Sequence, residues 1–592
     1  MADPHPNVRT FVRLLGFLRP YRWSLAVSIV LAVGSQLAAV AIAFLTGDAL
    51  QRTVDSENTD QLWALALAVL LVGAARALFM IGRRLISGRQ ALAVEYDLRD
   101  EVYAKLLRLS FGFYDRHQTG QLMSRATVDL QSVRFFLGYG LIFFFQYVLT
   151  IVGVTIALFV IEWKLALAAA AFTPLLVYLA YRYSQVSHPV LRDVQQRMAD
   201  VATVAEENIV GVHVVKSFAQ EQSEAAKFDE KTEAVFRRSV DANRQRSLYV
   251  PLLSFLPLIA QAIVLLYGGR MVASGELALN SFFTFNVLVL MLVMPLRMLG
   301  MWIGQAQRAT ASGERIFEVI DETEDVADAP HADDLPPGDG RIAFEHAGFE
   351  YANGRPVLEE IDLEIAPGKT VALIGHTGSG KTTLASLVPR FYDVTKGCLM
   401  IDGADVRNLR VASLRRAIGI VAQDPFLFSA TVRENITFGV AAASDEDVVR
   451  AARLAQAEDF IRELPDGYDT VIGERGITLS GGQRQRIAIA RALLVDPRII
   501  ILDDAAASVD ATTEARIRLG LREAMKGRTT LIVAHRLSTI ALADELVVLD
   551  RGRIVARGTQ EELLEGSPVF REIYEHGLLE REFAERVEAA GA

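Results

Sequence analysis

The sequence predicts a chain of two unlike parts, an α-helical membrane domain with six spans and long cytoplasmic extensions, followed by an α/β domain. Of its 592 residues, 51% are hydrophobic and only 22% are charged, an apolar composition for a soluble protein. The long apolar runs all lie before residue 304, and short apolar runs that alternate with helical patterns lie beyond it. Charge is divided as well, because residues 1–320 carry 30 basic and 25 acidic side chains whereas residues 321–592 carry 31 and 46.

Composition also excludes several classes of protein. The net charge of −10 at pH 7 opposes binding to nucleic acid, which needs a basic surface. The single cysteine, Cys398, excludes an internal disulfide framework and a cysteine-rich zinc site, and its ordinary role is that of a small hydrophobe. Met1–Arg22 is arginine-rich, and the apolar run behind it is longer than the core of a signal peptide. We therefore expect a retained anchor among membrane lipids and no nucleic-acid partner.

Six apolar stretches approach the roughly 20 residues that a helix needs to cross a bilayer. Buried helices of soluble proteins rarely run so long, so a large soluble helical core is disfavoured. The predicted spans are Ser24–Gly47, Leu62–Ile86, Leu137–Ile161, Leu165–Tyr183, Pro251–Ala273 and Leu277–Ile303.

Basic residues predict the orientation of these spans. Four arginines precede the first span, and the segments after the second and fourth spans hold further clusters, from Arg83 to Arg134 and from Arg182 to Arg246. The other connections are short and poor in Lys and Arg. By the positive-inside rule, we expect a multi-pass protein of the cell (inner) membrane with both termini in the cytoplasm.

The two inner connections, residues 87–136 and 184–250, are too long to be simple loops. Both are rich in helix formers, so we expect the spans to continue as helices into the cytoplasm. Breaks are predicted at Phe113–Asp115 with Thr119-Gly120, and at Gly211. The resulting hairpin tips would project from the membrane and contact another domain.

An acidic segment separates the two parts of the chain. Residues 321–340 hold eight acidic residues, three prolines and neither Lys nor Arg, which is typical of a linker. We accordingly expect a membrane domain over 1–320, a linker over 321–340, an α/β domain over 341–577 and a tail over 578–592. The α/β domain is expected to hold a largely parallel sheet, with strands at Thr370–Ile374, Ile499–Leu502, Thr530–Ala534 and Glu545–Leu549.

A phosphate-binding motif follows the apolar strand Val371–Ile374. Its glycines let backbone N–H groups surround phosphate oxygens, its lysine supplies a positive charge, and its first threonine offers a hydroxyl to Mg²⁺. These residues predict an α/β P-loop nucleotide-binding domain with ATP and Mg²⁺ as cofactors. The predicted nucleotide ligands are Gly375, His376, Thr377, Gly378, Ser379, Gly380, Lys381, Thr382 and Thr383. Asp503, at the end of a second apolar strand, is assigned with Thr382 to the metal.

Between these two motifs stands Leu479-Ser-Gly-Gly-Gln483, followed by a helical pattern. Here the sequence resembles the ATP-binding cassette (ABC) family, specifically exporter-type half-transporters, over nearly its whole length. In that family this string resembles the signature motif, which contacts the γ-phosphate of ATP held by the opposite cassette. A Ser-Gly-Gly turn at a helix N-terminus suits an anion. The resemblance thus adds Ser480, Gly481, Gly482 and Gln483 to the predicted ATP ligands.

Further residues match the family's motifs one at a time. Tyr351 resembles the aromatic residue that stacks on adenine, Gln423 the glutamine that reaches Mg²⁺ and the attacking water, and His535 the switch histidine at the γ-phosphate. Glu474 resembles part of a loop that contacts the hairpin tips, and Ser508–Asp510 the loop that links the two ATP sites. The predicted catalytic residues are therefore Gln423, His535 and the residue after Asp503.

That last residue, Asp504, departs from the family pattern, which has glutamate at this position. The aspartate carboxylate retreats by about 1 Å, and a misplacement of that size can cost about a hundredfold in rate. In heterodimeric exporters of this family, one subunit resembles this chain and its partner carries the glutamate. The resemblance thus favours a second half-transporter as partner in a heterodimer, and a homodimer that tolerates Asp504 stays open.

The cargo is indicated only by polar residues within the spans, which are costly in lipid unless they are paired or face a cavity. For the amides, hydrogen bonds between helices are at least as plausible as cargo contacts, and Arg76 is the better candidate for a cavity. Phe135, Phe136 and Phe143–Phe145 could line an apolar pathway, although packing or lipid contact is favoured. We expect an ATPase that exports a small hydrophobic or amphipathic compound, drug or lipid. A regulatory ATP-binding subunit and an importer of the same layout stay open. The amides are Gln36, Gln146, Gln261, Asn286 and Gln305.

Overall fold

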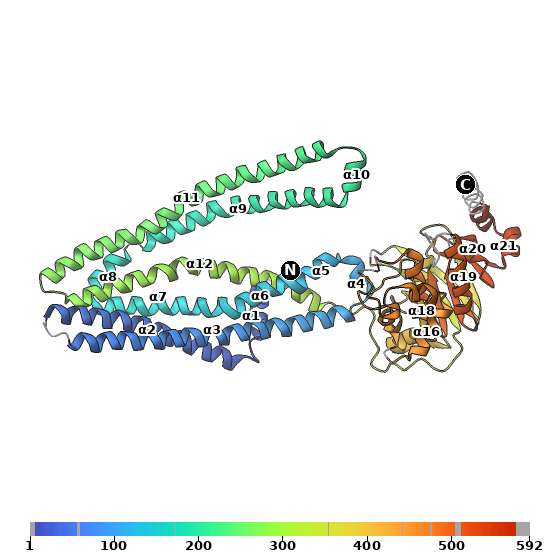
Figure 1. Cartoon of the computed structure of the whole chain (residues 1–592), viewed down its shortest axis with the longest axis horizontal. Coiled ribbons are helices and arrows are strands. Elements are labelled where there is room, and N and C mark those ends of the chain that lie inside the picture. The colour runs from blue at the N-terminus through green and yellow to red at the C-terminus, as the bar shows by residue number, and fades with distance from the viewer. Residues whose placement is uncertain are drawn as a thin grey trace. The chain divides into compact units, whose positions relative to one another are not determined.

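The computed structural model describes residues 6–55, 60–171, 173–352, 354–440, 442–473, 476, 478–503, 511–534 and 536–575. The chain divides into two compact units (Figure 1). One is made of Met1–Ala104 and Met123–Asp321, and the other of Lys105–Leu122 and Glu322–Ala592. A short segment from the first half of the sequence therefore belongs to the second unit.

The first unit is helical throughout its described residues. Two of its turns are π-helical, η1 and η2, on either side of α6, a feature often found at functional positions in long helices. The elements are α1 (Pro6–Gly16), α2 (Arg22–Asp55), α3 (Asp60–Arg108, whose end enters the second unit), α5 (Thr119–Ser124), η1 (Arg125–Asp129), α6 (Leu130–Phe135), η2 (Phe136–Gly140), α7 (Leu141–Ile161), α8 (Trp163–Ala170), α9 (Thr173–Val210), α10 (Val212–Ser217), α11 (Glu221–Ala273) and α12 (Leu279–Asp321).

Five helices among the described residues are long and apolar enough to cross a membrane. They contain four of the six predicted spans in full and all but the first two residues of Leu277–Ile303, and the helical membrane domain is confirmed. The fourth predicted span, Leu165–Tyr183, overlaps most of α8 and the start of α9, and Phe172 between them lies outside the described residues.

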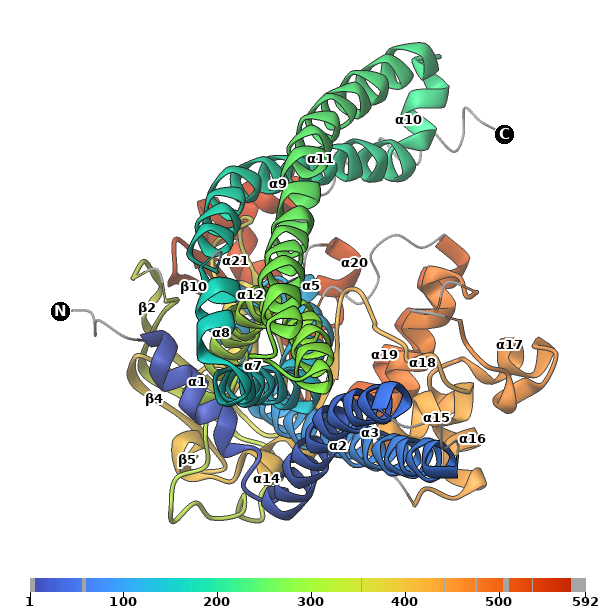
Figure 2. The ribbon, with the colours of Figure 1, turned by 90° about the vertical axis from the view of Figure 1, so that its left-hand side faces the viewer.

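Helices do extend the spans through both inner connections, and both connections turn where a hairpin was predicted, although the first turn uses other residues than expected. Gly211 ends α9 as expected, and α10 forms the tip of the α9–α11 hairpin (Figures 1 and 2). Phe113–Asp115, by contrast, lies inside a short helix, α4 (Phe111–Arg116), and Thr119-Gly120 begins α5. The chain turns instead on either side of α4. Phe113 is buried and stacks on His117 at 4.2 Å between ring centroids, which stabilises this helix.

Small residues let the helices of the first unit approach closely. A Cβ on Gly138 would lie 2.1 Å from the Cβ of Ala91, so η2 and α3 touch where glycine is required.

Gln261 Nε2 donates to Asn286 Oδ1 at 2.8 Å between α11 and α12, and Gln146 accepts a hydrogen bond from Arg83. Arg76 is exposed in this chain. The amides Gln146, Gln261 and Asn286 thus pair between helices.

The aromatic residues near η2 pack against one another. The Phe143 ring stacks on Trp302 at 5.4 Å and Phe135 stacks on the same indole at 5.8 Å, while Phe136 is buried. Packing, one of the two favoured roles, therefore applies to these three side chains.

The second unit holds the α/β domain, with two sheets. A six-stranded sheet has the order β10-β9-β3-β8-β7-β6, parallel except for the pair β9–β10, and includes the four predicted strands. A four-stranded antiparallel sheet, β2-β1-β4-β5, was not predicted. The strands are β1 (Ile342–Glu350), β2 (Pro356–Ile365), β3 (Thr370–Ile374), β4 (Lys396–Ile401), β5 (Ala404–Asp405), β6 (Ile418–Val421), β7 (Ile499–Asp503), β8 (Thr529–Val533), β9 (Glu545–Asp550) and β10 (Arg553–Gly558).

Helices cover the six-stranded sheet, and two hydrophobic cores form on its faces. One core joins Ile374 and Leu502 to α18, and the other joins Val371 and Leu399 to the antiparallel sheet. The helices are α13 (Lys381–Leu387), α14 (Val411–Arg416), α15 (Val432–Ile436), α16 (Asp445–Leu454), α17 (Glu458–Glu463), α18 (Gly481–Leu494), α19 (Ala511–Met525), α20 (Leu537–Ile540) and α21 (Gln560–Gly566), with 3₁₀ turns η3 (Val406–Asn408), η4 (Thr437–Gly439) and η5 (Gly467–Asp469).

Hydrogen bonds tie the acidic segment, residues 321–340, to the second unit, although its composition predicts a linker. We call this segment with its hydrogen bonds the strap. Asp402 Oδ1 accepts hydrogen bonds from the backbone N–H groups of Gly340 and Arg341 at 2.8 and 2.9 Å, and its other oxygen accepts one from Arg498. Upstream, Asp328 accepts from the Val411 N–H at 2.8 Å. Asp328, one of the acidic residues that suggested a solvated spacer, therefore serves as a local acceptor.

We predict that Asp402→Ala destabilises this unit, because it leaves the buried Gly340 N–H without its acceptor. The expected loss is about 1–3 kcal/mol, or a drop in Tm of about 3–10 °C for a domain of this size. Thermal unfolding of the purified chain measures it. Asp402→Asn, which keeps one oxygen, should lose less. Asp334→Ala is the control, because that carboxylate is 68% exposed in a 3.5 Å pair with Arg410. Equal Tm values for Asp402→Ala and the control contradict the strap.

Candidate functional site

The predicted phosphate-binding loop, residues 375–380, joins β3 to α13. All five residues of β3 are buried, and β3 lies between the parallel strands β8 and β9. Because the carboxyl ends of parallel strands meet at one edge, the loop leaves the sheet where β7 and β8 also end. The rigid sheet thus positions a loop of small residues.

Glycine is required at two positions of this loop. A Cβ on Gly375 would lie 2.1 Å from the Leu549 carbonyl oxygen, so any larger residue would push the loop away from β9. Gly380 has a φ of +102°, in the left-handed region, and begins α13. The loop therefore approaches its neighbours as closely as its backbone permits.

Lys381 is folded into the loop that it ends. Its side chain is 4% exposed, and its ammonium group donates to the carbonyl oxygens of Gly375 at 2.7 Å and His376 at 3.0 Å. Burial lowers the pKa of Lys381, and the carboxylate of Asp503 partly opposes that shift. The ammonium is thereby held in the curve of the loop, where a phosphate would meet it.

The loop also has the chemistry to receive ATP. The hydroxyl oxygen of Ser379 is buried, and no hydrogen-bond partner faces it among the described residues. A buried hydroxyl without a partner is costly, and a phosphate oxygen would satisfy it. Beside it, open space lies where Gly378 would carry a Cβ. The loop therefore fits a triphosphate.

Three oxygen-bearing side chains come from three different elements near this loop. Thr382 is exposed at the start of α13, Asp503 ends β7, and Gln423 is exposed just after β6. Hydroxyl, carboxylate and amide oxygens are the hard ligands that Mg²⁺ prefers, so this donor set fits the ion. Two other predicted catalytic residues, Asp504 and His535, lie outside the described residues.

Tyr351 lies over α13, just beyond β1. Its hydroxyl shares a hydrogen bond with the Thr383 hydroxyl at 3.2 Å, and its ring meets Phe349 edge to face at 4.8 Å. The ring is half-buried, so one part of it remains open to a ligand. The predicted adenine-stacking residue and the predicted phosphate loop are therefore neighbours.

The predicted signature residues begin α18. Ser480 is the N-cap, and its hydroxyl accepts from the Gln483 N–H at 3.3 Å while the Gln483 side chain accepts from the Ser480 N–H at 2.8 Å. This capping box holds the turn before any ligand arrives. Ser480 and Gly481 are exposed, whereas the side chain of Gln483 is engaged within the turn. Glu474 and residues 508–510 lie outside the described residues.

One arrangement was not predicted from the sequence, a clamp between α18 and the segment after Gln423. The Arg491 guanidinium donates to the Asn435 carbonyl at 2.7 Å, the Asn435 side-chain oxygen at 2.9 Å and the Phe426 carbonyl at 3.0 Å. Asn435 is fully buried and bonds both backbone groups of Phe428. Gln485 Nε2 donates to the Ala422 carbonyl at 3.3 Å. The segment that carries Gln423 is therefore tied at both ends to the helix of the signature turn.

A signal for this clamp was present in the sequence. Arg491 follows the buried residues Ile487 and Ala488 at helical spacing, and an arginine on an apolar stripe requires a partner. The partner, Asn435, lies 56 residues earlier, so spacing alone did not identify it.

Comparison with known proteins gives consistent results for both parts. The model of the ABC transporter transmembrane region matches residues 25–296, and the ABC transporter model matches residues 358–507. An ATP-dependent lipid A-core flippase of Syntrophus aciditrophicus is 37% identical over 563 residues, covering 94% of this chain and 92% of that protein. A multidrug efflux ATP-binding/permease protein of Mycobacterium tuberculosis is 39% identical over 95% of this chain and 47% of that protein.

A solved structure, of a bacterial Atm1-family ABC exporter with ATP bound, has a TM-score of 0.79 and 29% identity. The similarity covers 94% of this chain and 98% of the other.

We predict that Arg491→Lys loosens the segment 424–431. An ammonium group cannot reproduce the three directed donors of the guanidinium. A loss of about 1–3 kcal/mol in the local stability of this segment increases its local opening by about 5- to 150-fold. Amide hydrogen exchange measures it, with exchange of residues 375–380 unchanged.

The control for this experiment is Arg518→Lys, an exposed position on α19. Unchanged exchange over 424–431 in Arg491→Lys, or equal acceleration in the control, contradicts the clamp.

Proposed function

This chain belongs to the ABC transporter family and is an ATPase-coupled multi-pass membrane transporter, and from that premise we propose that it is one half of a dimeric exporter of hydrophobic or amphipathic compounds. The observation that carries the proposal is that one chain joins apolar spanning helices to a triphosphate-fitting loop. The flippase and efflux protein named above support export.

The roles proposed at the nucleotide follow from where the side chains lie. Lys381 and the loop amides bind the phosphates, Ser379 donates its free hydroxyl, and Tyr351 stacks on adenine. Thr382, Gln423 and Asp503 would hold Mg²⁺, which neutralises phosphate charge when it is bound. Asp504 orients the attacking water and His535 contacts the γ-phosphate. These last two roles rest on the sequence alone.

We propose that a second half-transporter completes each ATP site. Ser480 and Gly481 are exposed at the start of α18, as residues that serve the opposite cassette must be. Ser480–Gln483 would contact ATP held on the partner's loop, and the partner's signature turn would contact ATP held by Gly375–Thr383. The capping box gives the turn its shape in advance, so few side chains need to be ordered on closure.

The partner is proposed to be a different chain, because Asp504 replaces the usual glutamate. With the shorter carboxylate, ATP on this chain's loop is hydrolysed slowly, while this chain's intact signature serves a faster site on the partner's loop. The mycobacterial relative, of which this chain spans about half, is consistent with two half-transporters acting as a pair.

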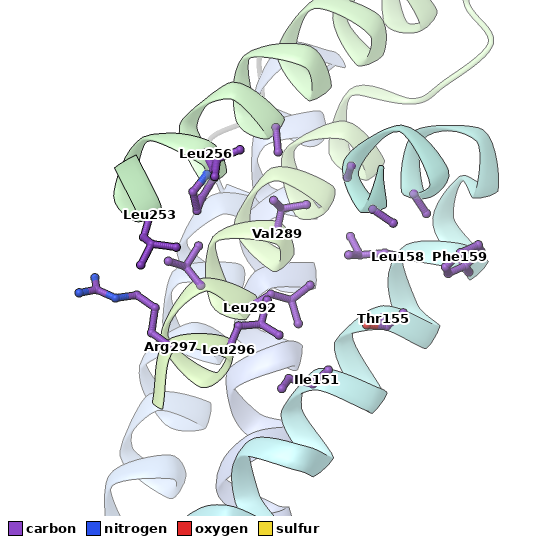
Figure 3. Close-up of a pocket in the computed structure, with 16 residues that line it drawn as sticks. Ile151, Thr155, Leu158, Phe159, Leu253, Leu256, Val289, Leu292, Leu296 and Arg297 are labelled. Atoms are coloured by element: carbon purple, nitrogen blue, oxygen red, sulfur yellow. The ribbon is translucent and has the colours of Figure 1, made fainter. Parts of the chain in front are cut away.

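The cargo class is supported by a cavity within the first unit. A space of about 300 Å³ lies among α7, α8, α11 and α12, and leucine, valine, isoleucine and alanine side chains dominate its lining (Figure 3). Arg297 stands at its rim, with its guanidinium directed away from the leucines. An apolar body with one polar end fits such a site. We propose a substrate with that amphipathic character.

Orientation and domain limits are proposed on the sequence. Positive residues place both termini on the cytoplasmic side of the inner membrane. The proposed domains are 1–320, 321–340, 341–577 and 578–592. Residues 105–122 form an excursion of the first domain that packs within the second unit.

We predict ATP-dependent accumulation of a hydrophobic dye in proteoliposomes whose cassettes face outward, with this chain and its partner reconstituted together. Lys381→Ala removes a charged phosphate contact worth about 1.5–3 kcal/mol, so it should weaken ATP binding by about 10- to 100-fold. Dye fluorescence inside the vesicles and ATP binding are the measurements. Dye that leaves preloaded vesicles on addition of ATP contradicts export.

We predict that the chain purified alone hydrolyses ATP slowly and that Asp504→Glu raises turnover by up to about a hundredfold, because it restores the missing methylene. Phosphate release measures the rate, with Asp504→Asn as the charge-free control. Fast turnover by the unmodified chain, abolished in Asp504→Asn, contradicts the heterodimer and supports a homodimer.

A further inference from the structure

One tyrosine of the second unit touches both the inner connection and the proposed base-stacking residue. The Tyr392 hydroxyl donates to Asp115 Oδ2 at 2.7 Å, and Asp115 lies on α4. The Tyr392 ring meets Tyr351 edge to face at 5.5 Å between centroids, and Phe349 packs at 5.4 Å. Tyr392 therefore contacts the residue on which adenine is proposed to stack.

The turn that carries Tyr392 is held in a strained conformation. Arg390 has a φ of +53°, which costs a residue with a Cβ about 1–3 kcal/mol. Its buried guanidinium binds both oxygens of Asp393, at 2.7 and 3.1 Å, and two backbone carbonyls, of Leu409 and Ala327. These contacts offset the strain and fix the direction of the two side chains that follow.

Those two side chains both contact α4. The Phe391 ring packs at a tilt against Phe111, at 4.3 Å between centroids, and the Tyr392 hydroxyl donates to Asp115. Burial, together with the hydrogen bond to Asp115, raises the pKa of the Tyr392 phenol, so it remains a neutral donor. A cavity of about 680 Å³, lined by residues of α4 together with Tyr351 and Tyr392, adjoins these contacts and leaves the rings room to shift.

Other contacts hold this tip without Tyr392. Lys105 pairs with Glu324 at 3.0 Å, Arg116 pairs with Glu322 at 3.0 Å, and the Ser110 hydroxyl donates to Asp325 at 3.3 Å. The tip should therefore stay attached when the phenol is removed. The hydrogen bond from Tyr392 to Asp115 is therefore one of several contacts and is not needed for attachment alone.

We propose that Tyr392 is a positioning residue that links occupancy of the nucleotide base at Tyr351 to the tip formed by residues 110–116. A base stacked on Tyr351 fixes the Tyr351 ring, and the Tyr392 ring packs edge to face against it. The hydrogen bond from the Tyr392 phenol then fixes the position of Asp115. By thermodynamic reciprocity, the tip in turn stabilises the base-binding position of Tyr351. This inference rests on the proposed role of Tyr351.

Tyr392→Phe in the full-length chain tests the link, because it keeps the ring contacts and removes the hydrogen bond. Loss of one ordinary hydrogen bond should weaken ATP binding by up to about fivefold. Binding of inorganic tripolyphosphate, which has no base to stack, should not change. Asp115→Ala should reproduce the effect. Tyr468→Phe is the control, since that buried hydroxyl has no partner among the described residues.

A double-mutant cycle separates this inference from the proposed function. If Tyr392 acts through Tyr351, Tyr392→Phe should not alter ATP affinity further in a Tyr351→Ala background. An effect of equal size in both backgrounds, an equal effect on tripolyphosphate, or no effect at all overturns the link. Unchanged ATP affinity in Tyr351→Ala alone overturns the base-stacking role instead.

Discussion

The nucleotide site depends on one steric constraint, the close approach of the loop after β3 to the end of β9. Gly375 has no room for a side chain beside the Leu549 carbonyl, and the buried strands on both sides of β3 do not yield. In the same loop, two carbonyls hold the ammonium group of Lys381, and the Ser379 hydroxyl has no partner among the described residues. These groups are the proposed phosphate donors, and a loop fixed in this way would need little rearrangement on binding.

Other residues of the site lie on segments that are joined to one another by hydrogen bonds outside this loop. Arg491 and Gln485 tie the segment of Gln423 to α18, whose first turn is the exposed signature. The segment of Gln423 and a turn that is proposed to serve the opposite cassette are therefore joined through α18. Coupling between two sites needs an element that can adopt two arrangements. The three hydrogen bonds of Arg491 would let α18 and the segment after Gln423 act as one such element.

Much of this organisation could be predicted from the sequence, because its signals are local. Spans are recognised by length, and the loop at Gly375–Thr382 by its spacing after a strand. The α4 helix could not be predicted in this way, since Phe113–Asp115 is stabilised by burial of Phe113 and by the distant residues Phe391 and Tyr392. The hydrogen bonds of Asp402 could not be predicted either. Its carboxylate accepts from the backbone N–H groups of Arg341 and Gly340, which lie 61 and 62 residues away in the sequence.

The two inner tips differ in a way that bears on assembly. The first tip is covered by its own chain, through Phe391 and Tyr392. The second has no buried residue in α10, and its apolar side chains at Ile209, Val210 and Phe218 are between 71% and 79% exposed. The second unit likewise exposes Phe426, Phe428 and Phe438, whose rings pack on one another.

Exposed apolar surface on this scale marks a site of association. If the proposed partner has the same layout, each chain of the pair offers a tip and an aromatic cluster for the other chain to cover. We infer that the chain is incomplete alone, whichever half-transporter pairs with it. The turn at Ser480 and Gly481 is exposed as well, and it is proposed to contact ATP that the partner carries.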